Sequence, residues 1–182
     1  MNKEIIEAIC DTLIKNKDEL NRLDSICGDG ECGSNLVNGA NNILESLNDI
    51  DSFRKLGMIL NSAGCGTLGT MLSFLLMRLD KATTLKEAAD IMKQTFERKS
   101  DATVGDKTMA DALIPWVHVV TTDGTLPMAA KAAMEGAQTT TDMLGKFGRG
   151  KIAGGKAIGT MDPGAYATAL IFEQISEHFE RK

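Results

Sequence analysis

The sequence predicts an all-α protein. Apolar residues recur at spacings of three and four along nearly the whole chain, as in helices that bury one face. No stretch alternates apolar and polar residues in the manner of a half-buried strand. Aromatic residues make up only 4% of the 182 residues and methionine occurs ten times, which is typical of a helical core filled by aliphatic side chains. Nothing in this composition favours a β-sandwich.

Four helices are predicted in the N-terminal part of the chain. The first covers residues 6–13, and the second begins near Ser34 or Asn35, ahead of a stripe of leucine and isoleucine. Residues 53–60 form a third amphipathic segment. Residues 67–79 are apolar on almost every side, so we expect this fourth helix to lie inside the protein.

Four further helices are predicted in the C-terminal part. Thr84 and Glu87 form a capping box that opens the first of them. The last begins at Asp162, a capping residue followed by the proline favoured at the first helical position, and continues through residue 179. The two between them cover residues 108–120, with a bend at Pro115, and residues 126–144.

Composition excludes several classes of protein. The net charge is −5 and the lysines and arginines are scattered, so the chain lacks the basic surface of a nucleic-acid-binding protein. No apolar run reaches the roughly 18 residues of a membrane span. The N-terminus lacks the basic and apolar regions of a signal peptide. We therefore expect a cytoplasmic protein with no nucleic-acid or membrane partner.

The four cysteines show no disulfide spacing. A zinc site built from Cys27, Cys32 and Cys65 is disfavoured, because the spacing between the first two is loose and the chain has only two histidines.

An acidic, glycine-rich run over residues 23–35 is the strongest candidate site. Asp24, Asp29 and Glu31 lie among three glycines directly before a predicted helix start. Carboxylate oxygens are the ligands that Mg²⁺ prefers, and glycines let the backbone approach a ligand closely. The pattern alone is equally compatible with a metal and phosphate site and with a solvated surface turn.

The remaining glycines gather in a few connections, which could meet at one end of a helical bundle. Predicted helix starts after Gly33, Gly66, Asp106 and Asp162 would then present backbone N–H groups to an anion. Each connection taken alone is more typical of an ordinary linker between helices.

Nucleophilic catalysis has little support. His118 lies in an apolar helical stretch and His178 in a polar turn, and neither has a serine or cysteine partner that the sequence can assign. The chain contains no P-loop motif, and the acidic run does not fit an EF-hand.

Three motifs in order carry a family resemblance. They are Leu23-Asp24 with Gly28-Asp29-Gly30-Glu31-Cys32-Gly33 and Asn35, Gly105-Asp106-Lys107-Thr108-Met109 with Asp111-Ala112-Leu113, and Gly148-Arg149 with Gly154, Ile158-Gly159 and Asp162-Pro163-Gly164. They resemble the signatures of the nucleotide-binding L subunit or L domain of dihydroxyacetone kinases. This resemblance implies one domain over residues 1–182, folded as a barrel of about eight antiparallel amphipathic helices. It also implies an adenine nucleotide and two Mg²⁺ ions in the loops at one end.

The resemblance also implies roles for individual residues. Asp24, Asp29 and Glu31 would ligate the two Mg²⁺ ions, and Met109 would lie against the adenine. The other expected nucleotide-binding residues are Cys32, Gly33, Ser34, Asn35, Thr67, Leu68, Gly69, Arg149, Asp162, Pro163 and Gly164. No residue is expected to act as a catalytic nucleophile.

The implied function is phosphoryl transfer in a dihydroxyacetone (glycerone) kinase of glycerol metabolism. The ketose would be held by a separate K subunit, without which this subunit would be inactive. In the version that depends on the phosphotransferase system, bound ADP is rephosphorylated by a phosphohistidine-carrying M subunit, whereas fused kinases bind ATP directly. A single short domain favours the first version, and a homodimer is compatible with the sequence.

Two substitutions depart from the family pattern. Glu31 replaces the usual aspartate, and Leu68 occupies the position of a serine that faces the phosphates, with Thr67 as an alternative source of the hydroxyl. The third motif, over residues 148–156, also lacks the usual small hydroxyl and acidic residues. These changes permit a second reading, a non-catalytic nucleotide-sensing module that binds another subunit or a transcription regulator.

Overall fold

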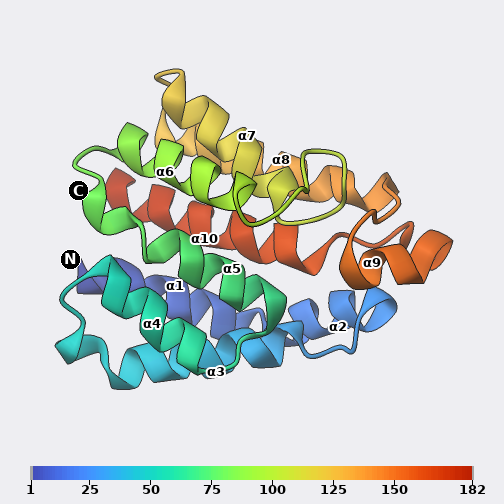
Figure 1. The fold of residues 1–182 in the computed structure, drawn as a ribbon, viewed down its shortest axis with the longest axis horizontal. Helices are drawn as coiled ribbons and strands as arrows, with labels where there is room; N and C mark the ends of the chain where they lie inside the picture. The colour runs from blue at the N-terminus through green and yellow to red at the C-terminus, as the bar shows by residue number, and fades with distance from the viewer. Residues whose placement is uncertain (1, 182) are drawn as a thin grey trace.

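The regular structure of the protein is helical throughout (Figure 1). A computed structural model describes residues 2–181, which contain ten α helices, four short 3₁₀ helices and no strand. The prediction of an all-α fold is confirmed. The α helices are α1 (Lys3–Lys15), α2 (Lys17–Cys27), α3 (Cys32–Glu45), α4 (Phe53–Ser62), α5 (Gly66–Leu76), α6 (Leu85–Glu97), α7 (Ala110–Thr121), α8 (Leu126–Thr139), α9 (Gly148–Ala153) and α10 (Pro163–Glu180). The 3₁₀ helices are η1 (Leu47–Asp49), η2 (Leu79–Lys81), η3 (Thr140–Asp142) and η4 (Gly154–Ala157).

Two helices were not predicted. The sequence of α2 is mostly polar and, besides Asp24, it buries only Leu20 and Leu23, so its apolar stripe is too narrow to stand out. The six residues of α9 include two glycines and bury no side chain. Both helices flank the candidate site, where packing against neighbours outweighs weak local preference.

Several predicted boundaries were wrong. Helix α3 begins at Cys32 rather than near Ser34 or Asn35, and α7 begins at Ala110 rather than at about Thr108. The helix predicted over residues 67–79 ends at Leu76, and the one predicted over residues 126–144 ends at Thr139. Each of these two C-terminal ends is followed by a short 3₁₀ turn, which tightens the chain where the α-helical hydrogen bonds run out. Helix α7 continues through Pro115.

The predicted caps of α6 and α10 are present. The Thr84 hydroxyl accepts a hydrogen bond from the Glu87 N–H (3.1 Å), while the Glu87 carboxylate turns back to Thr83, accepting from its N–H (2.8 Å) and hydroxyl (2.7 Å). Asp162 Oδ1 accepts from the Ala165 N–H at 2.7 Å, directly ahead of Pro163. Helix α10 therefore begins at a position that is set by the side chain of a predicted site residue.

The main core lies among α6, α7, α8 and α10. Trp116 of α7 stacks on Phe172 of α10, with 4.2 Å between ring centroids. Helices α7 and α8 approach very closely at Gly136, where a Cβ would lie 1.9 Å from the Asp111 carbonyl oxygen. This packing fixes the start of α7, which carries part of the candidate site.

The helices bring several connections to one end of the molecule. In Figure 1, α2, α9 and the N-terminal end of α10 lie at the right-hand end, beside the start of α3. The predicted convergence of glycine-rich connections is thus present. No helix among residues 2–181 has the length and apolar character needed to cross a membrane.

Candidate nucleotide and metal site

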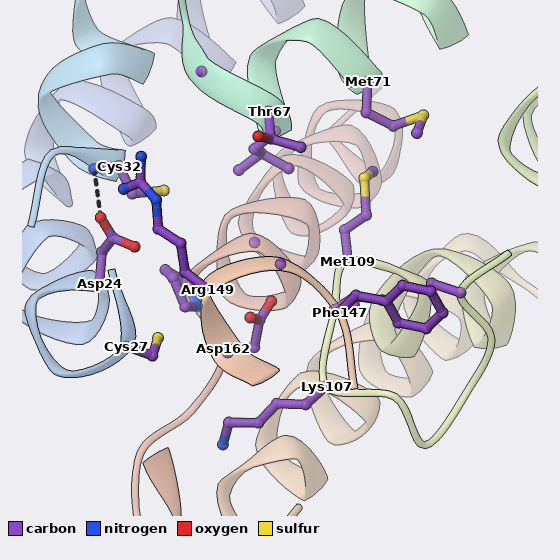
Figure 2. Close-up of a pocket in the computed structure, with 18 of the residues that line it drawn as sticks. Asp24, Cys27, Cys32, Thr67, Met71, Lys107, Met109, Phe147, Arg149 and Asp162 are labelled. Atoms are coloured by element: carbon purple, nitrogen blue, oxygen red, sulfur yellow. Dashed lines mark hydrogen bonds between the residues drawn. The ribbon is translucent and has the colours of Figure 1, made fainter. Parts of the chain in front are cut away.

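A cavity of about 360 Å³ opens where these connections meet (Figure 2). Its walls come from α2 and the following turn, the starts of α3, α5, α9 and α10, the end of α6 and the turn before α7. Most of the predicted site residues line it. These are Asp24, Asp29, Cys32, Asn35, Thr67, Leu68, Met109, Arg149, Asp162, Pro163 and Gly164.

Asp24 organises the acidic side of the cavity. It lies in the last turn of α2, and its Oδ2 accepts hydrogen bonds from the N–H groups of Glu31 (3.1 Å) and Cys32 (3.3 Å), the second of which is drawn in Figure 2. Burial raises the pKa of Asp24, and hydrogen bonding to the neighbouring Asp29 carboxyl raises it further. The site therefore has two adjacent carboxyl groups, an arrangement that favours a bound cation.

Asp29 also pairs with Arg149 of α9, and both residues line the cavity. This hydrogen bond and ion pair hold the pKa of Asp29 below its usual range. Glu31 is exposed and does not line the cavity. Within residues 2–181, no group of three or more histidine, cysteine or carboxylate side chains is arranged to hold a metal ion, so the three-ligand set stays a prediction.

Two predicted residues at the start of α3 contact α2 instead of the cavity. Gly33 has no room for a side chain, because a Cβ would lie 2.1 Å from the Lys17 carbonyl oxygen. Ser34 exchanges two hydrogen bonds with Asn21 of α2, its N–H donating at 3.0 Å and its hydroxyl accepting at 2.9 Å. Neither residue lines the cavity. Cys32 and Asn35 on the same helix do.

The start of α5 forms the facing wall. Thr67 and Leu68 both line the cavity, and Figure 2 shows Thr67 pointing into it. Gly69 does not line it. A Cβ at this position would lie 2.1 Å from the Cys65 Cβ, so there is room only for glycine. Thr67 therefore brings a hydroxyl to the cavity, and its contact with the phosphates stays a prediction.

The turn before α7 is held by buried polar groups. Asp111 accepts hydrogen bonds from the N–H groups of Gly105 (2.6 Å) and Thr108 (2.8 Å). Lys107 adopts a positive φ of 59°, and Figure 2 shows its side chain pointing away from Met109. Its ammonium donates to three carbonyl oxygens, those of Thr140 (2.6 Å), Ala157 (3.0 Å) and Thr160 (2.5 Å). These bonds keep the Met109 side of the turn against the cavity.

Asp162 combines a structural and an electrostatic role. Besides capping α10, it donates through its own N–H to the Thr140 hydroxyl at 2.8 Å. Burial raises its pKa to about 7, although hydrogen bonding to the Ala165 N–H opposes the shift. Gly164 follows on the first turn of α10, where a Cβ would lie 3.7 Å from the Met109 nitrogen.

Some cavity residues were not predicted. Cys27 lines it and lies within the acidic run, but was considered only as a disfavoured zinc ligand. Phe96 and Phe147 also line it although neither belongs to an unusual local pattern, so only the tertiary arrangement reveals them. Lys107 belongs to the second motif, but the sequence could not show that it ties this turn to carbonyl groups over 30 residues away in the chain.

The arrangement suits a ligand with a flat apolar part and an anionic part. Leu68, Met71, Phe96 and Met109 supply apolar surface. The first turns of α3, α5 and α10 lie at the wall and carry the partial positive charge of helix N-termini. The cavity lining contains no histidine, and burial raises the pKa of the Cys32 thiol to about 12, so it offers no activated nucleophile.

Comparison with known proteins agrees with this geometry. Residues 26–177 match the family model of the DAK2 domain. The probable dihydroxyacetone kinase of Dictyostelium discoideum is 29% identical over 94% of this chain, and this chain spans only about a third (32%) of that relative. The ADP-binding subunit DhaL of the PTS-dependent dihydroxyacetone kinase of Lactococcus lactis is 29% identical over 90% of this chain and 88% of its own length.

A solved structure is similar over nearly the whole chain. The crystal structure of the dihydroxyacetone kinase from C. freundii in complex with AMP-PNP and Mg²⁺ superimposes with a TM-score of 0.77 at 28% identity. The alignment covers 98% of this chain and 34% of that kinase.

Proposed function

The chain belongs to the DAK2 domain family, and from its site we propose that it is the ADP- or ATP-binding, phosphoryl-transfer subunit of a dihydroxyacetone kinase. The proposal takes residues 1–182 as one nucleotide-binding domain of a cytoplasmic enzyme. The observation that carries it is that one cavity is lined by an acidic pair, Asp24 and Asp29, by three helix N-termini and by an apolar surface.

Each wall has a role in binding Mg²⁺ and nucleotide. Bound Mg²⁺ would supply positive charge that stabilises the transferring phosphoryl oxygens. Asp24 and Asp29 would hold the metal, with Glu31 as the third ligand of a two-ion site. The first turns of α3 and α5, with Thr67, would receive the phosphates. Met109 and Leu68 would lie against the base.

Arg149 and Asp162 would close the site. Arg149 lines the cavity and pairs with Asp29 on its acidic side, so its guanidinium is placed to contact anionic oxygens. Asp162 and Pro163 fix the start of α10 beside the turn that carries Met109. Because the cavity lining offers no activated nucleophile, its contribution is positioning and charge stabilisation.

The ketose and the phosphoryl donor would come from other chains. Relatives of matching length are described as ADP-binding subunits of PTS- or PEP-dependent kinases, which supports a system with a dihydroxyacetone-binding K subunit and a phosphohistidine-carrying M subunit. Other curated relatives are about three times as long, so a direct ATP-dependent transfer is the alternative donor.

A nucleotide-sensing role without catalysis is the second candidate. It is favoured by one observation, that Glu31 is exposed and outside the cavity lining, which would leave only two carboxylates for the metal. Mass spectrometry of nucleotide released from the native protein separates the candidates. Retained ADP supports the coenzyme role, and readily exchanged ATP supports direct transfer. Absence of nucleotide, together with no phosphoryl transfer when K and M subunits are added, would refute the proposal of an active subunit.

A further inference from the structure

A second concave surface lies between the C-terminal parts of α5 and α6. It has a volume of about 390 Å³ and is lined by two helical faces. From α6 and the two residues that follow it come Ile91, Gln94, Thr95, Arg98 and Lys99, and from the segment between the end of α5 and η2 come Phe74, Met77, Arg78 and Lys81. Both sets follow the three- and four-residue spacing of one helix face. We call this surface the α5–α6 groove.

The floor of the groove is apolar and lies outside the core. Phe74, Met77 and Ile91 are half-buried, yet none of them belongs to the buried clusters that hold the helices together. Met77 lies against α4, where a Cβ at Gly57 would be 2.8 Å from the Met77 Cγ. The remaining exposed surface of the three side chains lines the groove and is available to contact apolar side chains of another molecule.

The rim of the groove is cationic and unpaired. Arg78, Lys81, Arg98 and Lys99 are all exposed, and the ion pairs found within residues 2–181 include none of them. Lys99 instead lies over the Phe74 ring, 4.4 Å from its centroid.

Other cations on α6 behave differently. Lys86 pairs with Asp123 at 3.4 Å and Lys93 with Glu97 at 2.5 Å. The carboxylate nearest in sequence to Arg78 and Lys81, Asp80, is directed to the start of α4, where it accepts hydrogen bonds from two backbone N–H groups. Positive charge at the groove is thus left uncompensated in a chain whose net charge is −5.

From this charge and shape we propose that the α5–α6 groove binds an acidic amphipathic helix of a partner protein. Apolar side chains of the helix would fill the floor, and its carboxylates would meet the four cations on both sides. A small anion is a poorer fit, since the groove has no buried polar group to fix it. Nucleic acid is disfavoured by the negative charge of the rest of the chain.

The groove and the nucleotide cavity share the end of α6. Thr95 and Lys99 line the groove, while the adjacent Phe96 and Ser100 line the cavity. The two surfaces remain separate in their chemistry, because the groove uses none of the acidic or glycine-rich segments. The docking proposal therefore stands or falls independently of nucleotide binding.

Fluorescence anisotropy with a labelled synthetic peptide tests the proposal. The peptide is an amphipathic helix of about 15 residues, a length that can form a marginal helix, with leucine on one face and glutamate on the other. A scrambled peptide of the same composition is the matched probe. We expect the amphipathic peptide to bind at low salt, more weakly as salt is added, and at least about tenfold more tightly than the scrambled one, a difference of about 1.4 kcal/mol.

Charge-reversed variants locate the binding. The double variant Arg78→Glu/Arg98→Glu should weaken binding about tenfold or more. The control Lys15→Glu/Lys131→Glu changes the net charge equally at exposed positions on α1 and α8 and should leave affinity within about twofold. Thermal unfolding and ADP binding establish that both variants are folded.

Hydrogen exchange gives an independent readout that does not depend on a variant. Protection on peptide binding should be confined to residues 74–81 and 91–99. Equal weakening by both double variants, equal binding of the scrambled peptide, or protection spread over the whole chain would overturn the proposal. Binding to phosphatidylserine vesicles without binding of the peptide would also overturn it.

Discussion

Replacing Lys107 by methionine tests whether the hydrogen bonds of its ammonium stabilise the turn before α7. Methionine keeps nearly the same length and, like lysine, must adopt the positive φ of 59°, so backbone strain is the same in both proteins. The change removes the ammonium and its hydrogen bonds to the carbonyl oxygens of Thr140, Ala157 and Thr160.

The expected loss of stability follows from these three bonds. A hydrogen bond from a charged donor contributes roughly 1.5–3 kcal/mol. Part of that gain is offset by the cost of burying the ammonium, which lowers the pKa of Lys107. The Thr140 and Ala157 carbonyls also accept backbone bonds, so they are not wholly orphaned in the variant. We therefore expect a net loss of about 2–4 kcal/mol, or a fall in Tm of roughly 5–15 °C.

Urea and thermal unfolding followed by circular dichroism measure this loss. The matched control is Lys156→Met, which removes another lysine of the same region that is exposed and belongs to none of the ion pairs found within residues 2–181. Because substitutions at such exposed positions change stability little, the control should lose less than about 1 kcal/mol. An equally small loss of stability for Lys107→Met would refute the claim that the Lys107 hydrogen bonds hold this turn.

The remaining predictions concern pH dependence and helix packing. The pKa of Asp162 is about 7 in the folded protein against an ordinary 3.8, so the folded state holds the proton more tightly and stability is lost as pH rises from 4 to 7, by on the order of 2–4 kcal/mol. Asp162→Asn keeps an oxygen for the cap, and urea unfolding across this range should show a flatter profile; an unchanged profile contradicts the assignment. Gly136→Ala should cost about 1–3 kcal/mol, since its Cβ would lie 1.9 Å from the Asp111 carbonyl oxygen. Gly155→Ala, with no atom within 4 Å of the new Cβ, is the control, and equal losses in thermal unfolding would show that the close approach of α7 and α8 is unimportant.

Much of the fold was predictable because most helices bury a broad apolar stripe. Eight of the ten α helices in residues 2–181 were anticipated, including the capped starts of α6 and α10. Helix α2 was not, because Leu20 and Leu23 are the apolar residues that it buries in an otherwise mostly polar sequence. Its discovery changes the interpretation of the acidic run, since Asp24 now lies in a helical turn and only residues 28–31 form the loop.

The candidate site was predictable where the motif residues face the ligand space. Asp24, Met109 and Asp162 all line the cavity. Motif position alone could not separate these from Gly33 and Gly69, which are glycine because neighbouring atoms leave no room for a side chain. The α5–α6 groove had no sequence signal, since it depends on how far apart two helices lie.

The central claim is that the acidic pair binds Mg²⁺ that bridges to the nucleotide. Calorimetry of ADP binding, with Mg²⁺ and with excess chelator, tests it most directly on the native protein, on Asp29→Ala and on the control Asp11→Ala, which changes an exposed carboxylate of α1. We predict binding only with Mg²⁺, lost in Asp29→Ala and retained in Asp11→Ala. Equal affinity for ADP in the presence of chelator would contradict the account.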